Sequence, residues 1–398
     1  MSINSIENTF KLSTLDEAPI STDKDSGFSA LNKAFENISE AVEDFDFNTI
    51  DDNSTTVYQI YNFDNDLDTS DLPHYDDPKR YRFQGFTMTD DYIYISAYDK
   101  EGKPSLLLVY DNDGNYVGRV ALPSGVSRYA HVGGMSYDKE HDILYITDKK
   151  GKVLALDNEI LSAAIKDCTS ELGKGFNIDL DEKKDFEIDD FIIDKQSLDI
   201  RKSIEEFMGP DYDGYLPDAA SVYYDEENHK IYIPTFSEDS KIFVYDVEFD
   251  NKGKPSYKFD TIYGMGKDDV NKINDTNLPY AVQGVGTYTD SNGDKYLLIN
   301  SSYSGIDSAI TKYKINDDGS IEFAGQHIFN NKYGIENMVV DPDTGDIYCN
   351  YENNVAGTRQ DGGHIEKINI NDIDGSNTDT NYILLMIKLK FAAKFNGN

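Results

Sequence analysis

From about residue 83 onward, one pattern of apolar and polar positions repeats five times along the chain. Each unit starts with small residues around a polar one, then has a short apolar strand, an acidic or glycine-containing turn, and a strand rich in β-branched and aromatic residues. The units begin with "QGFTMTDDYIYISAYD" at Gln84, "HVGGMSYDKEHDILYITD" at His131, "PDAASVYYDEENHKIYIPTF" at Pro217, "VQGVGTYTDSNGDKYLLINSS" at Val282 and "GIENMVVDPDTGDIYCNYE" at Gly334. Short apolar runs between turn residues predict β-strands.

Third and fourth strands follow in these units. The third strands are "SLLLVYD", "GKVLALD", "SKIFVYD", "ITKYKIN" and "HIEKINI", and the fourth are "YVGRVALP", "SYKFDTIY", "IEFAGQHIF" and, at the C-terminus, "NYILLMIKLKF". Four short antiparallel strands at a period of about 50 residues are typical of a propeller blade. We therefore predict an all-β fold, a β-propeller of five or six four-stranded blades. The strand "TTVYQIYNFD" at 55–64 belongs to no complete unit and is expected to complete a sixth or a shared blade.

Two segments break the repeat. The stretch "SGFSALNKAFENISEAVEDF" has apolar residues at three- and four-residue steps, which predicts an amphipathic helix in an acidic N-terminal extension, residues 1–53. The propeller then spans residues 54–398. Within it, an insertion at about 158–216 contains "NEILSAAIKDCTSEL" and "DKQSLDIRKSIEEFM", both predicted to be helices. Insertions of this kind lie in loops on one face of a repeat protein, often the face that binds.

The residues that open the inner strands are the candidates for chemistry. In this alignment they are Gln84, His131, Asp218, Gln283 and Glu336, with Asn337 beside the last. Because inner strands run along the propeller axis, these side chains are expected to point into the central channel or its mouth. The predicted ligand-binding residues are Gln84, His131, Asp218, Gln283 and Asn337, and the predicted metal ligands are Glu336 and Asp218. The alternative is that the polar openers hydrogen-bond neighbouring blades and line a wet channel without activity.

The charge balance narrows the class of partner. The chain of 398 residues has 37 Lys and Arg against 74 Asp and Glu, a formal net charge of −37. This charge repels phosphate backbones, so we expect no nucleic-acid partner. It favours cations or a partner with a basic face. The two cysteines, Cys168 and Cys349, form neither a disulfide framework nor a zinc-ligand cluster.

The chain start and its apolar runs bear on location. The start "MSINSIENTFKLSTLDE" lacks the basic residues and apolar run of a signal peptide, and "YILLMI" is too short to span a bilayer, so no transmembrane segment is expected. An extracellular, cell-surface or virion-associated location by another export route is one expectation, and a cytoplasmic location is the alternative.

Other motifs are weaker signals. The segments "DNDGN", "NDDGS" and "DPDTGD" are expected to be hairpin turns, and the first two also resemble fragments of calcium loops. The chain has no G-x-S-x-G nucleophile elbow, no P-loop and no G-x-G-x-x-G before a helix. No motif therefore indicates a particular reaction.

The units resemble a broad group of bacterial β-propellers, through Gln84–Tyr98, Val109–Asp111 and His131–Asp138. More distantly, Glu336 in "GIENMVVDPDTGDIYC" is similar to the glutamate that opens an inner strand in calcium-dependent lactonase and SMP-30-like propellers. That resemblance implies a Ca²⁺ ion held by Glu, Asn and Asp side chains. Glu336 and Asp218 match two of these roles, and the asparagine is unassigned.

Three functions remain open on the sequence. The first is a non-enzymatic module that holds a carbohydrate, a cell-wall polymer or a protein at the channel mouth and the insertion. The second is a Ca²⁺-dependent hydrolase or lactonase, with Glu336 and Asp218 as ligands and His131 as acid–base catalyst. The third is an interaction scaffold with an empty channel. The sequence does not decide whether the protein is an enzyme.

Overall fold

The computed structural model describes residues 58–62, 81–99, 105–122, 132–148, 151–173, 176–179, 192–208, 218–237, 240–264, 278–279, 281–303, 306–329, 334–352 and 364–373. The chain divides into two compact units, Met1–Ser54 and Thr55–Asn398, and every described residue belongs to the second. The predicted N-terminal helix and the predicted C-terminal strand "NYILLMIKLKF" lie outside the described residues.

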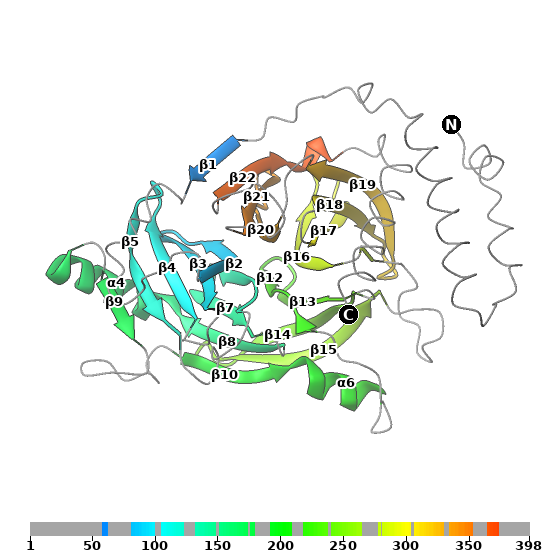
Figure 1. Ribbon diagram of the computed structural model, residues 1–398. Coiled ribbons are helices and arrows are strands. Elements are labelled where there is room, and N and C mark those ends of the chain that lie inside the picture. The colour runs from blue at the N-terminus through cyan, green and yellow to red at the C-terminus, as the bar shows by residue number, and fades with distance from the viewer. Residues whose placement is uncertain are drawn as a thin grey trace, which may run out of the picture. The chain divides into compact units, whose positions relative to one another are not determined.

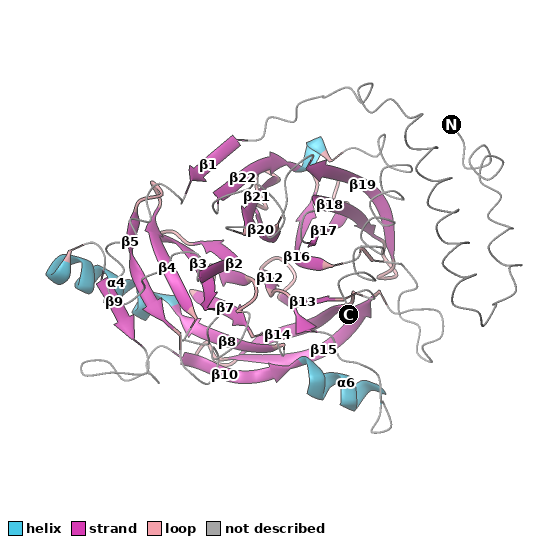
Figure 2. Cartoon of the chain, in the orientation of Figure 1, coloured by secondary structure: helices cyan, strands magenta, loops and turns pink. Residues whose placement is uncertain are grey.

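The described strands form five sheets around a common axis, which confirms the β-propeller (Figures 1 and 2). From the axis outward, blade 1 contains β2 (Tyr81–Met88), β3 (Tyr92–Asp99), β4 (Leu106–Asp111) and β5 (Tyr116–Ala121). Blade 2 contains β6 (Met135–Asp138), β7 (Ile143–Thr147), β8 (Lys152–Asp157) and β10 (Ile192–Asp199).

The other three blades repeat this order. Blade 3 contains β11 (Asp218–Ala219) and β12 (Tyr223–Asp225) at the inner position, then β13 (Lys230–Phe236), β14 (Ile242–Phe249) and β15 (Pro255–Tyr263). Blade 4 contains β16 (Val282–Thr289), β17 (Lys295–Tyr303), β18 (Ile306–Ile315) and β19 (Ile321–Phe329). Blade 5 contains β20 (Ile335–Val340), β21 (Asp346–Tyr351), β22 (His364–Asn369) and β1 (Tyr58–Asn62).

Strand β1 closes the ring. It pairs antiparallel with β22, so the outermost strand of the last blade comes from the start of the propeller sequence. The strand expected at 55–64 therefore completes a shared fifth blade, and the described strands form no sixth one. Closure of this kind leaves β22 paired on both of its edges.

The core consists of five apolar clusters, one between each pair of adjacent blades. Side chains alternate along a strand, so Tyr92 and Tyr94 of β3 pack toward blade 2, while Ile93 and Ile95 pack toward blade 5. Both faces of a middle strand are thus buried. This explains why these strands read as continuous apolar runs such as "YIYIS" and "LLLVY" rather than as an alternating pattern.

The insertion contains α4 (Asn158–Leu172), β9 (Phe176–Asp179), β10 and α6 (Ile200–Met208). Helix α4 confirms the first predicted helix residue for residue, with the Asp157 side chain accepting a hydrogen bond from the backbone N–H of Ile160 at its N-cap. The second predicted helix, from Asp194, is wrong in its first half. Residues up to Asp199 form β10, because the free edge of β8 takes a strand there, and only then does α6 begin. Strand β9 adds to blade 1 parallel to β5.

The propeller has two ends, defined by its inner strands. At the mouth end the inner strands begin, and at the turn end they turn back into the second strands. The segments "DNDGN", "NDDGS" and "DPDTGD" are hairpin turns at the turn end, with Gly114, Gly319 and Gly345 in the left-handed region at φ 83°, 79° and 70°. The turn interpretation of these three segments is confirmed.

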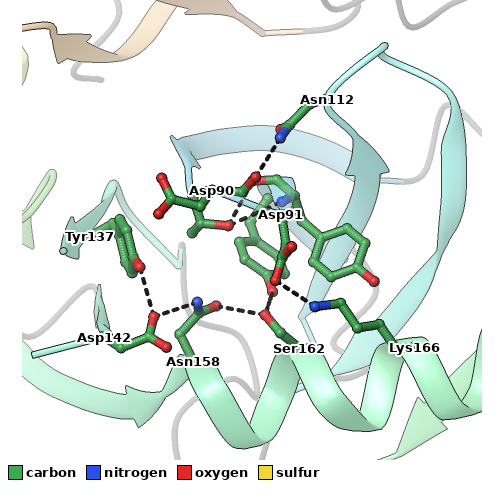
Figure 3. A network of polar contacts seen from close by, with 11 residues as sticks. Asp90, Asp91, Asn112, Tyr137, Asp142, Asn158, Ser162 and Lys166 are labelled. Atoms are coloured by element: carbon green, nitrogen blue, oxygen red, sulfur yellow. Dashed lines mark hydrogen bonds and ion pairs between the residues drawn. The ribbon is translucent and has the colours of Figure 1, made fainter.

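Helix α4 docks at the turn end through polar contacts (Figure 3). Lys166 lies 2.7 Å from Asp91, and Asp142 accepts hydrogen bonds of 2.7 Å from both the Tyr137 hydroxyl and the Asn158 amide. The α4 part of the insertion is therefore at the end opposite the channel mouth. Helix α6, by contrast, begins at the mouth end, where the Ile200 N–H donates to the Gly151 carbonyl.

Candidate functional site

The inner strands are irregular at the level where the predicted site lies. The pairing register shifts between Phe83 and Phe86 in β2, across Gln283 in β16 and across Glu336 in β20. In blade 3 the inner position is interrupted between β11 and β12. Bulges bend a strand and redirect its side chains, and they are common beside functional sites. The polar openers Gln84, Gln283 and Glu336 are therefore bulge residues.

The register defines an axial ring with one residue from each blade. In four blades, one residue of the inner strand pairs with the same position of the second strand: Phe86, Met135, Val285 and Met338. The residue directly before each of these belongs to the ring. In blade 3 the matching residue is Ser221, because the Ala220 N–H donates to the Pro234 carbonyl as the Gly133 N–H donates to the Thr147 carbonyl in blade 2. The axial ring is therefore Gly85, Gly134, Ser221, Gly284 and Asn337. Four of these side chains are absent or small, which leaves space at the axis for the fifth.

Asn337 fills this space. Its side chain is 1% exposed and accepts a hydrogen bond of 3.1 Å from the Ser221 hydroxyl. Its amide nitrogen donates to the backbone carbonyls of Phe86, at 3.1 Å, and Met135, at 3.3 Å. A Cβ added to Gly134 would lie 1.9 Å from the Ser221 hydroxyl oxygen, so this ring is too tight for larger residues. Asn337 thus links blade 5 to blades 1, 2 and 3 and closes the axis at this level.

Polar residues of the second strands reinforce the closure. Ser96 donates to the carbonyls of Val132 and Gly133, Asn300 to that of Ile335, and Asn350 to that of Gln84. Ser96, Asn300 and Asn350 occupy the same place in their blades and are at most 2% exposed. Sequence reasoning missed them, although a polar residue inside an otherwise apolar strand is the signal that could have found them.

The structure separates the predicted openers. Gln84, Gln283 and Glu336 occupy the same place in their blades, directly before the axial ring. Asp218 is not their equivalent. It lies in β11 and pairs with Phe236 of β13, which is the place that Arg82 holds in blade 1. The residue directly before the ring in blade 3 is Ala220, which precedes Ser221. His131 lies outside the described residues, and Gly133 holds the matching place in blade 2. The alignment of Asp218 was therefore wrong by two residues.

The mouth of blades 1 and 5 contains two carboxylates and one guanidinium. Arg82 lies 3.4 Å from Glu352, and both side chains are largely buried. Glu336 is half-buried beside them, and the electrostatic influence of Glu352 and Arg82 reaches it. Tyr98 completes the group: burial, and then the charge of Glu352, raise the pKa of its hydroxyl to about 12. We call Arg82, Tyr98, Glu336 and Glu352 the mouth cluster.

Glu336 is the unusual member of the mouth cluster. Burial and the negative charge of Glu352 raise the pKa of its carboxyl well above the ordinary value, and Arg82 only partly opposes them. Among the described residues, no hydrogen-bond donor contacts this carboxyl. It is therefore an acid that holds its proton to a higher pH than a surface glutamate does.

Replacing Glu336 with glutamine is expected to change the pH dependence of stability. A carboxyl whose pKa is raised on folding binds more protons in the folded state, so its contribution is present below the unfolded pKa and is lost as the pH rises. We expect Glu336→Gln to match the parent at about pH 4 and to be more stable by about 1–3 kcal/mol at about pH 8.

Urea unfolding at both pH values measures this difference, and Glu171→Gln on the exposed surface of α4 is the matched control. The same stability difference at both pH values in Glu336→Gln would contradict the raised pKa.

The mouth cluster does not make a calcium site on its own. Ca²⁺ takes six to eight oxygen ligands, whereas no three His, Cys, Asp or Glu side chains in the described ranges are grouped to hold a metal. The guanidinium of Arg82 already places a positive charge beside Glu352. Calcium binding through Glu336 and Asp218 stays a prediction.

The turn end has its own acidic group, which serves below as a comparison surface. Lys139 lies 2.7 Å from Asp90. The hydrogen bond to Asp90, and then the charges of Asp90, Glu226 and Asp343, raise the pKa of Lys139. Asp90, Glu226 and Asp343 come from blades 1, 3 and 5, so the turns of separate blades converge near the axis at this end.

Comparisons with known proteins find only weak similarity to solved structures. No protein-family model matches the chain, and no curated protein matches its sequence. A protein of unknown function from Bacteroides thetaiotaomicron is 12% identical, with a TM-score of 0.35 over 72% of this chain and 58% of its own, so the chain spans less than two thirds of that protein.

Two further solved structures are similar at this level. The β-propeller domain of Cps50 (Swd1) from Myceliophteria thermophila is 10% identical, with a TM-score of 0.33 over 70% of this chain and 66% of its own. The periplasmic gluconolactonase from Pseudomonas aeruginosa is also 10% identical, with a TM-score of 0.33 over 70% of each chain.

The described part of the chain has no helix long and apolar enough to cross a membrane. The protein is a five-bladed β-propeller whose axis is closed by Asn337.

Proposed function

We propose that this protein is a non-enzymatic binding propeller that receives a positively charged side chain of a protein partner at the mouth cluster. The observation that carries the proposal is the Glu336 carboxyl, half-buried, without a hydrogen-bond donor among the described residues and beside a second carboxylate. The net charge of −37 supports a basic partner, because it attracts one over a distance before contact.

A bound cation would change the protonation of Glu336. An ammonium or guanidinium against the carboxyl favours its ionised form and lowers its pKa, so binding near neutral pH releases a proton. Arg82 already forms an ion pair with Glu352, so the incoming cation is expected to pair with Glu336. The closed axial ring beneath makes the mouth a shallow receptor for the tip of a side chain.

Calorimetric titration with a lysine-rich peptide tests this proposal. At about physiological ionic strength (~0.15 M), we expect binding to weaken about tenfold in Glu336→Gln/Glu352→Gln. The control Glu226→Gln/Asp343→Asn removes two exposed carboxylates from the turn end and should stay within about twofold of the parent. In two buffers of different ionisation enthalpy, the parent should also show proton release, and Glu336→Gln should not.

Equal weakening in both double variants would mean general attraction to an acidic surface and would reject the mouth as the receptor. A loss confined to Glu226→Gln/Asp343→Asn would place the partner at the turn end and would reject it as well.

The second candidate is a Ca²⁺-dependent hydrolase or lactonase. The raised pKa of Glu336 favours it, because catalytic acids and bases are tuned in this way at functional sites. Titration of metal-stripped protein with Ca²⁺, followed by lactone hydrolysis assays, distinguishes the two functions. Saturable binding of one ion per chain that is lost in Glu336→Gln, together with Ca²⁺-dependent turnover, would replace the binding proposal by this one.

A further inference from the structure

A cavity of about 400 Å³ lies between blades 3 and 4, away from the mouth cluster. Strands β13, β14 and β15 form one wall, and β16, β17 and β18 form the other. Its volume is within the range of small-molecule sites in proteins, roughly 300–1,000 Å³. The apolar cluster of these two blades fills the rest of their interface, so the cavity is a local opening in an otherwise packed contact.

Two tyrosines in this cavity have hydroxyl groups with no hydrogen-bond partner in the described part of the chain. Tyr232 is 4% exposed and Tyr263 is 5% exposed, and both line the cavity. Neither hydroxyl has a hydrogen-bond partner among the described residues. The hydroxyl of Tyr145, by contrast, is fully enclosed, and Tyr145 does not line the cavity. Buried polar groups normally find a partner, so these two hydroxyls point to a ligand.

Both hydroxyls are neutral donors. Burial, and then the charge of Asp260, raise the pKa of Tyr263, and burial together with Asp225 raises that of Tyr232. A phenol that keeps its proton can donate one hydrogen bond and accept another. Ligand groups that both accept and donate, as hydroxyl groups do, match this capacity.

The charges around the cavity are nearly balanced. Asp225, Asp260 and Lys230 line it from blade 3, and Lys295 and Asp318 line it from blade 4. Lys230 lies 2.7 Å from Asp260 and 2.6 Å from Asp246, and Lys295 donates to the Asn228 amide oxygen at 2.6 Å. Anionic ligands are repelled by the strongly negative chain. For a cation, Asp260 already has Lys230 beside it, and Asp225 and Asp318 already accept hydrogen bonds from Asn228 and Ser320. A neutral polar ligand fits this balance.

We propose that the cavity between blades 3 and 4 binds a neutral saccharide, a mono- or disaccharide, through the hydroxyls of Tyr232 and Tyr263. The threonines Thr261, Thr287 and Thr289 also line the cavity; the Thr287 hydroxyl lies 3.0 Å from that of Tyr223, and the Thr289 hydroxyl donates to Glu227. This site goes beyond the proposed function, because it shares no residue with the mouth cluster.

Saturation-transfer NMR and calorimetry of the full chain test the proposal. The probes are glucose, galactose, mannose, N-acetylglucosamine and their 1,4-linked disaccharides, with putrescine as the cationic comparison. We expect at least one saccharide to bind with a Kd of about 1 mM or tighter. Tyr232→Phe/Tyr263→Phe should weaken that binding about tenfold, because it removes only the two hydroxyls. Tyr145→Phe, with its enclosed hydroxyl between blades 2 and 3, should not change it.

Three results would overturn the proposal: no saccharide of the panel binds, the bound saccharide is insensitive to Tyr232→Phe/Tyr263→Phe, or putrescine binds in place of the sugars. Thermal melting of each variant checks that its fold is intact. Glu336→Gln/Glu352→Gln should leave saccharide binding unchanged, so failure of this site and failure of the mouth receptor are separate outcomes.

Discussion

Replacement of Asn337 by alanine is expected to destabilise the propeller by about 3–5 kcal/mol. The change removes the acceptor of the Ser221 hydroxyl and the donors to the Phe86 and Met135 carbonyls, and leaves all three partners at a buried axis. Each buried polar group left without a partner costs about 1–3 kcal/mol. Urea unfolding with an unchanged m-value measures the loss.

Asn292→Ala is the matched control, since Asn292 is exposed in the turn between β16 and β17. We expect it to change stability by less than about 0.5 kcal/mol. The experiment also tests the prediction that Asn337 binds a ligand. If Asn337→Ala were as stable as the parent and had lost peptide binding, the residue would act in recognition and not in closing the ring.

Removal of residues 1–63 is expected to cost more than about 3 kcal/mol, because it deletes β1. Without this strand, the edge of β22 is unpaired and blade 5 has three strands. Exposed edges of this kind promote aggregation. Thermal melting and light scattering should show a lower melting temperature and self-association. A synthetic peptide "TTVYQIYNFD", residues 55–64, should restore part of the lost stability by adding the strand in trans.

Removal of residues 1–54 is the control for this truncation. Thr55–Asn398 forms its own compact unit, so this shorter truncation should keep a cooperative melt close to that of the parent. If both truncated proteins had the same melting temperature, β1 would not be needed to close the ring. If neither lost stability, the pairing of β1 with β22 would be dispensable.

The blade architecture was predictable because its signals are local. Short apolar runs such as "ILYIT" and "SKIFVYD", separated by Asp-Gly and Asn-Gly turns, lie inside single strands and hairpins. Helix α4 was predictable for the same reason, since its apolar spacing and N-cap are within its own residues. The strand β10 was not, because its conformation comes from pairing with β8, which the local sequence does not show.

The candidate site was predictable only in part. Glu336 and Gln84 were identified as polar openers, and both lie at the mouth end. Asp218 was misaligned, because the inner position of blade 3 is interrupted between β11 and β12 and no sequence pattern marks that interruption. Arg82 and Glu352 were missed. Their meeting requires blades 1 and 5 to become neighbours, and only ring closure brings them together.

The amino-acid sequence by itself determined a repeated four-stranded unit, an additional strand at 55–64 and the acidic character of the chain, since all three depend on nearby residues or on composition. The tertiary structure alone decided which side chain occupies the axis, which carboxyls share the mouth and where a cavity opens between blades. These features depend on inner-strand bulges, where a shift of one residue turns a side chain to the other face. They also depend on contacts such as Asn337 with Phe86, which lie 251 residues apart in the chain.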